Sequence, residues 1–122
     1  MPLIPIRRNP SIISDDVIWE INEHLPAIAA KVLSCDEGGP LAPKDIMIEV
    51  DDIRPMDRHI KDIHIRVWAH DYPSRRGNDL AALRSIRKQI AIEVVKHLPE
   101  STTWYVWVLL ATTSYGSDTM DD

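Results

Sequence analysis

Residues 102–112, TTWYVWVLLAT, restrict the fold more than any other segment of this chain. Read as a strand, the segment places successive side chains on opposite faces. One face then carries Trp104, Val106, Val108 and Leu110, and the other carries Tyr105, Trp107, Leu109 and Ala111. A strand that is apolar on both faces must be covered on both faces. The fold must therefore supply two covering layers for this strand.

The rest of the chain shows two kinds of hydrophobic periodicity. Apolar residues alternate with a period of two in the strand-like segments and recur at helical spacing in the longer ones. Ser14 is expected to cap the first helix, and Asn78 is expected to cap the second. Pro5 removes one ladder donor, so its strand is expected at a sheet edge or with a bulge. In chain order, the patterns predict a strand at 2–8, a helix at 14–35, a strand at 45–51, a strand at 60–70, a loop at 72–77, a helix at 79–98 and a strand at 102–112.

These elements form two successive β-α-β units, which predicts an α+β fold with a four-stranded sheet. Right-handed crossovers place both helices on one face of that sheet. The other face is then an apolar surface larger than monomers usually expose, and another subunit is the simplest cover. A doubly wound sheet with one helix on each face is the alternative.

Composition sets the class of protein and its surroundings. The 122 residues are 44% hydrophobic and 27% charged, which suits one globular domain, expected at 1–115, with a flexible acidic tail at 116–122. A net charge of −5 argues against general binding to nucleic acid or to acidic membranes. Cys35 is the only cysteine, and no apolar run is long enough to span a membrane. The N-terminus lacks the order of a signal peptide, so the cytoplasm is the expected compartment.

Pro2 is the first candidate for chemistry. Methionine is commonly removed before proline, which would leave a secondary amine at the N-terminus of the first strand. An ordinary α-amino group titrates near 7.7–8.0. Burial and neighbouring cations lower the pKa of such an amine and make it a neutral base at physiological pH.

The chain resembles the tautomerase superfamily, in particular proteins similar to 5-carboxymethyl-2-hydroxymuconate isomerase and 4-oxalocrotonate tautomerase. The resemblance lies in the element order, in Met1-Pro2 opening a strand, in Pro40-Leu41-Ala42 before the second strand and in Val50-Asp51 at its end. It implies a homotrimer in which the N-terminal proline, Pro2 here, is the general base. The implied reaction moves a proton in a small anionic 2-keto or enol acid, without cofactor or metal.

Basic residues are the candidates for holding the substrate. The resemblance implies a substrate-binding arginine in the loop after the third strand, where Arg75 and Arg76 stand, and another basic residue just before the second strand, where Lys44 stands. Arg8 ends the first strand and is a further candidate for an anion. Each of these side chains can also be an ordinary solvated surface charge.

The histidines suggest a metal site at first sight, but their spacing argues against it. His64 and His70 share one strand face six residues apart, about 20 Å at 3.3 Å per residue. A single zinc ion binds its ligands at about 2 Å, so the two cannot share one. His64, Arg66 and Trp68 are instead expected to line a subunit interface or a pocket. Two functions stay open: an isomerase, and a non-catalytic oligomer of the same fold that binds or scaffolds partners.

Overall fold

Four strands and two long helices form residues 2–114, the part of the chain that the computed structural model describes. The predicted acidic tail, residues 116–122, lies outside the described residues. The elements are β1 (Leu3–Arg8), α1 (Asp15–Leu33), η1 (Pro43–Asp45), β2 (Met47–Asp52), β3 (Ile63–His70), α2 (Pro73–Arg76), η2 (Asn78–Leu80), α3 (Ala81–Val95) and β4 (Trp104–Ala111). The strands and the two long helices therefore follow the predicted order.

The first helix begins where its sequence predicts. The Ser14 side chain accepts a hydrogen bond from the backbone N–H of Val17 at 3.3 Å. Asp15 and Asp16 occupy the first turn, where the helix dipole favours negative charge. The cap prediction is confirmed. The buried stripe of α1 consists of Ile18, Ile21, Leu25, Ala29, Ala30 and Leu33.

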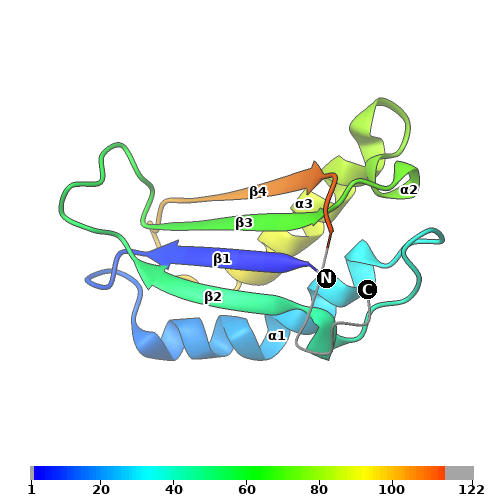
Figure 1. Ribbon diagram of the computed structural model, residues 1–122. Helices are drawn as coiled ribbons and strands as arrows, with labels where there is room; N and C mark the ends of the chain where they lie inside the picture. The colour runs from blue at the N-terminus through cyan, green and yellow to red at the C-terminus, as the bar shows by residue number, and fades with distance from the viewer. Residues whose placement is uncertain (1, 115–122) are drawn as a thin grey trace.

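The sheet has the order β2-β1-β3-β4, with both helices on one side (Figure 1). The two outer pairs, β1 with β2 and β3 with β4, are parallel, whereas the central pair β1 and β3 is antiparallel. Helices α1 and α3 pack against each other behind the sheet. The predicted α+β architecture is confirmed, and the alternative with one helix on each face is wrong. The core between sheet and helices is built on Ile4, Ile6, Ile63, Ile65, Val67, Ile86, Ile90 and Val94.

Pro5 does not lie at an edge, because β1 is a central strand. Nor does it carry a bulge: Leu3 pairs with Trp68 and Ile6 with Ile65, so the antiparallel register is the same on both sides of it. The expectation of an edge or a bulge is wrong. A missing ladder bond costs only about 1 kcal/mol, and full burial of an isoleucine side chain contributes about 1.5–3 kcal/mol. Burial of Ile4 and Ile6 on either side therefore outweighs the lost donor.

The connection between β3 and α3 also differs from prediction. Residues 72–77 are not an open loop, because Pro73–Arg76 form the short helix α2. Asn78 begins the 3-10 turn η2 rather than capping a helix. The long helix starts only at Ala81, after Leu80 in a left-handed conformation with φ 62°. Leu80 therefore precedes the helix and is exposed.

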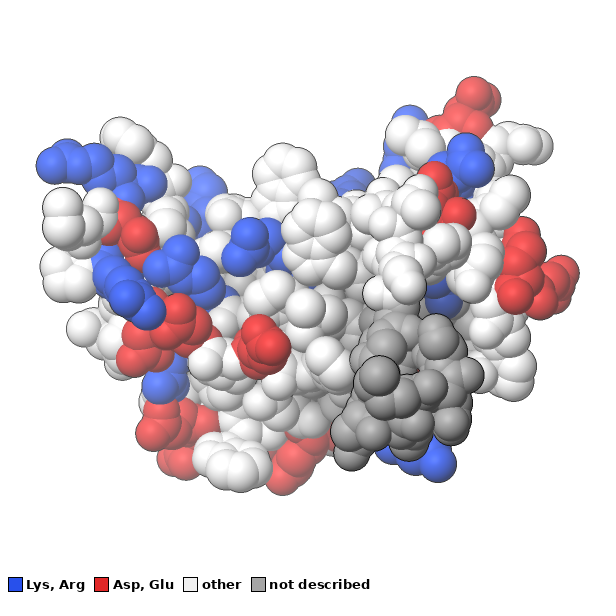
Figure 2. Space-filling view, viewed as in Figure 1, with Lys and Arg blue, Asp and Glu red and all other residues white. Residues whose placement is uncertain are grey.

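The face of the sheet turned away from the helices is uncovered over much of its area, and Figure 2 views the molecule from this side. We call this surface the open face. Its aromatic residues Trp107 and Trp68 are 56% and 37% exposed, whereas Val106, on the helix side of β4, is 8% exposed. Basic and acidic residues both gather toward the connection between β2 and β3, and mostly uncharged surface lies beside them in the middle (Figure 2). Within residues 2–114, no helix is long and apolar enough to cross a bilayer.

Candidate active site

Pro2 lies directly before β1 and is buried. Its carbonyl oxygen accepts a hydrogen bond from the Met47 N–H at 3.0 Å. Leu3 pairs with Met47 of β2 in parallel and with Trp68 of β3 in antiparallel. Pro2 is therefore at the end of the sheet where β2 begins and β3 ends, and we call this the Pro2 end.

Lys44 is placed at the Pro2 end by the turn that leads into β2. The Asp45 side chain accepts a hydrogen bond from the Ala42 N–H at 2.8 Å, which fixes the start of η1. Lys44 itself is exposed. Because η1 leads directly into the strand that pairs with β1, Lys44 lies at the same end of the sheet as Pro2.

Helix α2 carries the two predicted arginines and follows the C-terminal end of β3, so it too belongs to the Pro2 end (Figure 1). The two side chains differ sharply. Arg75 is 5% exposed and donates from Nε to the Leu33 carbonyl at 2.8 Å and from Nη1 to the His70 carbonyl at 3.1 Å. Arg76 pairs through Nε with the Asp71 carboxylate at 2.7 Å, and its side chain is 46% exposed. Arg75 thus ties three segments together, while Arg76 is accessible.

Replacing Arg75 by alanine should therefore lower the free energy of unfolding by about 2–4 kcal/mol, since two hydrogen bonds from a charged group are lost and the Leu33 carbonyl loses its side-chain donor. The His70 carbonyl keeps its bond from the Tyr72 N–H at 3.1 Å. Arg76→Ala is the matched control and should cost no more than about 1 kcal/mol, because it breaks only an exposed ion pair. Urea denaturation of both variants measures the difference. Equal losses in the two variants would mean that the buried hydrogen bonds of Arg75 add no more to the free energy of unfolding than the exposed ion pair of Arg76.

Arg8 lies at the other end of β1. It contacts the carboxylates of Asp15 and Asp52, and its Nη1 donates to the Ile13 carbonyl at 3.1 Å. Six residues along a strand correspond to about 20 Å from Pro2. Within one chain, the structure brings Lys44, Arg75 and Arg76 to the Pro2 end but not Arg8.

His70 and Tyr72 belong to the Pro2 end as well, and sequence reasoning did not assign them there. Their rings lie 4.5 Å apart between centroids. The Thr113 N–H donates to His70 Nδ1 at 3.2 Å, so a neutral imidazole carries its proton on Nε2. The available signal was the position of His70 at the end of the strand that precedes Arg75 and Arg76.

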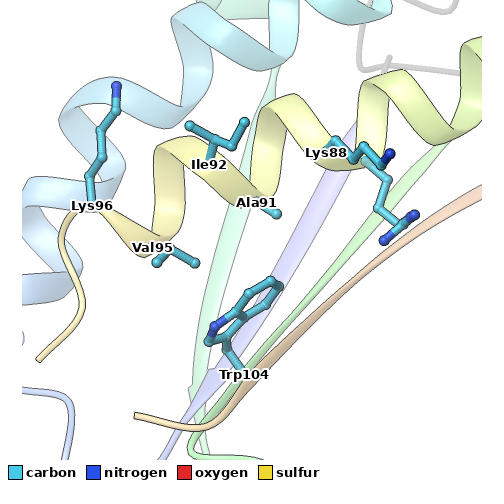
Figure 3. Close-up of a pocket in the computed structure, with 7 residues that line it drawn as sticks. Lys88, Ala91, Ile92, Val95, Lys96 and Trp104 are labelled. Carbon is cyan, nitrogen blue, oxygen red and sulfur yellow. The ribbon is translucent and has the colours of Figure 1, made fainter. Parts of the chain in front are cut away.

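A wide groove lies elsewhere, between α3 and β4. It measures about 510 Å³, and Figure 3 shows the Trp104 indole facing Ala91 and Val95 across it. Trp104 pairs with Ile63 at the start of β3, so this groove is at the opposite end of the sheet from Pro2. It is apolar with a basic rim and holds none of the predicted catalytic groups. The lining residues are Arg87, Lys88, Ala91, Ile92, Val95, Lys96 and Trp104.

The sequence matches no known protein-family model and no curated protein. Solved structures nevertheless share its fold. FG41 malonate semialdehyde decarboxylase inhibited by 3-bromopropiolate superposes with a TM-score of 0.65 at 13% identity, covering 95% of this chain and 90% of that one. A macrophage migration inhibitory factor-like protein from Entamoeba histolytica gives 0.61 at 14% identity, covering 96% and 95%.

N1, a member of the cis-3-chloroacrylic acid dehalogenase family, gives a TM-score of 0.60 at 12% identity, covering 94% of this chain and 81% of that one. These structural neighbours belong to the tautomerase superfamily. The chain therefore has the tautomerase fold, which confirms the resemblance predicted from the sequence. Identities this low show the fold alone, and the activity has to be argued from the site.

Proposed function

We propose that this protein is a tautomerase-type isomerase that moves a proton in a small anionic 2-keto or enol acid. The observation that carries the proposal is the position of Pro2. It is buried at the start of β1, at the sheet end that also receives Lys44, Arg76 and His70. Removal of Met1 would expose a secondary amine at this point, in a fold whose structural neighbours include named enzymes.

The proposed chemistry needs one base and an anchor for the substrate. The Pro2 nitrogen takes a proton from the carbon next to the keto group and returns it at another carbon or at oxygen. Burial and the charges of Lys44 and Arg76 favour the neutral amine before it accepts that proton. The same cations attract the substrate carboxylate, which the net charge of −5 would otherwise repel. No cofactor or metal is needed for this transfer.

The active form is proposed to be a homo-oligomer, most simply a trimer, that covers the open face. Exposed Trp107 and Trp68 give that face its apolar character. Contact between copies would bury both residues and add residues of a neighbouring chain to the surroundings of each site. We expect the assembly in the cytoplasm.

The second candidate function is a non-catalytic oligomer of the same fold that binds or scaffolds a partner. Two observations favour it. Pro2 is already buried within one chain, which limits access to its nitrogen, and the apolar groove beside Trp104 lies away from Pro2. This alternative predicts an assembly that turns over no keto acid.

An intact-mass measurement combined with a ketonisation assay tests the two candidates. The isomerase hypothesis expects a mass lacking Met1 and turnover of phenylpyruvate or 2-hydroxymuconate without added metal. A protein that lacks Met1, is folded and oligomeric, yet turns over neither compound would favour the binding protein. A retained Met1 would make the Pro2 nitrogen a non-basic amide and exclude it as the base.

Arg76→Ala should raise KM for a carboxylate substrate by about 10–100-fold, since one charge-assisted contact contributes about 1.5–3 kcal/mol. The loss should be small for an ester analogue that lacks the carboxylate. Arg84→Ala removes an exposed arginine from α3 and is the matched control. Steady-state kinetics on both substrates gives the comparison. Equal losses on acid and ester would show that Arg76 does not bind the carboxylate.

A further inference from the structure

A cluster of basic side chains lies on the open face, nearer the far end of β1 from Pro2. Arg7 pairs with His64 across the antiparallel β1–β3 ladder, and His64 pairs with Tyr105 on β4. Arg66 follows two positions along β3 on the same face. The His64 and Tyr105 rings lie 5.0 Å apart between centroids, which holds the imidazole in place. Three neighbouring strands thus build this cluster.

Four nitrogen atoms of the cluster are buried without partners within the described residues. His64 is 4% exposed, and neither of its ring nitrogens has a hydrogen-bond partner within the described residues. The Nε atoms of Arg7 and Arg66 are buried in the same way and also lack partners there. A buried polar group left unsatisfied costs about 1–3 kcal/mol. Several unpartnered nitrogen atoms in one place indicate that a bound group supplies their hydrogen-bond partners.

The charges of the cluster do not balance within residues 2–114. Arg7 pairs with the Asp57 carboxylate, which also accepts the Arg54 N–H at 2.8 Å. Arg66 forms no ion pair with any of these residues. Burial lowers the pKa of His64, and the charges of Arg66 and Arg7 lower it further, against an opposing effect of Asp57. Asp51 of β2 stands beside Arg7 in the parallel register, but its carboxylate pairs with Arg54, so these two charges offset each other. With His64 neutral, Asp57 is then left to balance both Arg7 and Arg66.

We propose that Arg7, His64 and Arg66 bind a small oxyanion, the carboxylate or phosphate group of a free ligand. Such a group accepts hydrogen bonds from an imidazole N–H and from the guanidinium N–H groups, and its charge balances Arg66. A free ion of a few atoms fits better than the surface of another chain, because it can pass between the long arginine side chains to shielded nitrogens that a protein surface cannot reach. Small movements of the long arginine side chains admit an ion of a few atoms. The site does not involve Pro2, so it stands apart from the proposed isomerase activity.

Titration of the intact protein with inorganic phosphate or acetate, against chloride at equal ionic strength, tests the site. The His64 ring signals in an NMR spectrum should shift saturably, and the pKa of His64 should rise, because the bound anion favours the imidazolium. Arg66→Gln should weaken binding about 10–100-fold. Arg84→Gln, which removes an exposed arginine of α3, should leave binding unchanged, and so should Pro2→Ala.

Three results would overturn the proposal. In the first, the His64 signals respond to neither anion. In the second, they respond equally in Arg66→Gln and in Arg84→Gln. In the third, neither anion would bind and Arg66→Gln would dissociate an oligomer, which would assign the unpartnered nitrogens to a contact between copies. The measurement of the His64 pKa needs no variant, so poor folding of Arg66→Gln would not decide the outcome.

Discussion

Pro2→Ala should lower the rate at which the enol of phenylpyruvate is ketonised about 10²–10⁴-fold, the usual effect of impairing a general base. The variant keeps an N-terminal amine once Met1 is removed, but a primary amine differs in basicity and in shape from the proline ring. The fold should survive, because the Pro2 side chain precedes the strand and its carbonyl bond to the Met47 N–H is retained. Stopped-flow or steady-state absorbance assays give the rates, and circular dichroism checks the fold.

Pro55→Ala is the matched control for Pro2→Ala, because it removes an exposed proline from the connection between β2 and β3. Its rate should equal that of the parent protein. A parent-like rate in Pro2→Ala would exclude the Pro2 amine as the base. It would leave His70, at the same sheet end, as the next group to test.

Trp107→Glu should convert the proposed oligomer into a folded monomer. Trp107 is 56% exposed in one chain, so the substitution leaves the fold of each subunit intact. In an assembly that covers the open face, the same substitution buries an unpaired charge, which costs several kcal/mol. At 1.4 kcal/mol for each factor of ten, association should weaken at least about 100-fold. Sedimentation velocity at micromolar concentration measures the change.

Trp19→Glu provides a matched control for Trp107→Glu. Trp19 is 69% exposed on α1, on the helix side of the molecule, and the substitution is chemically the same. Its association should match that of the parent. A parent protein that sediments as a folded monomer at micromolar concentration would contradict the assembly, and so would identical behaviour of the two variants.

Local signals made the elements predictable from the sequence. The Ser14 cap depends on residues within one turn, and the strands depend on alternation within a few residues, so both could be read from the chain. The placement of both helices on one face of the sheet followed from the handedness of crossovers. The position of Pro5 did not follow from its local preference, because burial of its neighbours in a central strand determines it.

The site was harder to predict because its contacts join distant segments. Arg75 is buried because it donates to the Leu33 carbonyl, 42 positions away along the chain. Every residue has a main-chain carbonyl, so the sequence does not indicate which one will accept this hydrogen bond. Two adjacent arginines look alike in the sequence, so it could not be predicted that Arg75 is buried and Arg76 exposed. His64 was expected at an interface or pocket, but only the packing of Tyr105 and Arg7 shows that its nitrogens are unpartnered.

The two outer strands of the sheet differ in a way that matters for a newly made chain. β2 carries exposed Glu49, Asp51 and Asp52, and charges of this kind discourage the addition of a foreign strand. β4 has no charge and no proline over residues 104–111, and it is rich in residues that favour strands. An unassembled subunit thus has one edge strand that its charges protect, β2, and one edge strand that is prone to pair with other chains, β4. Aggregation of subunits should begin at β4. Any partner that covers this strand should therefore keep the protein in solution.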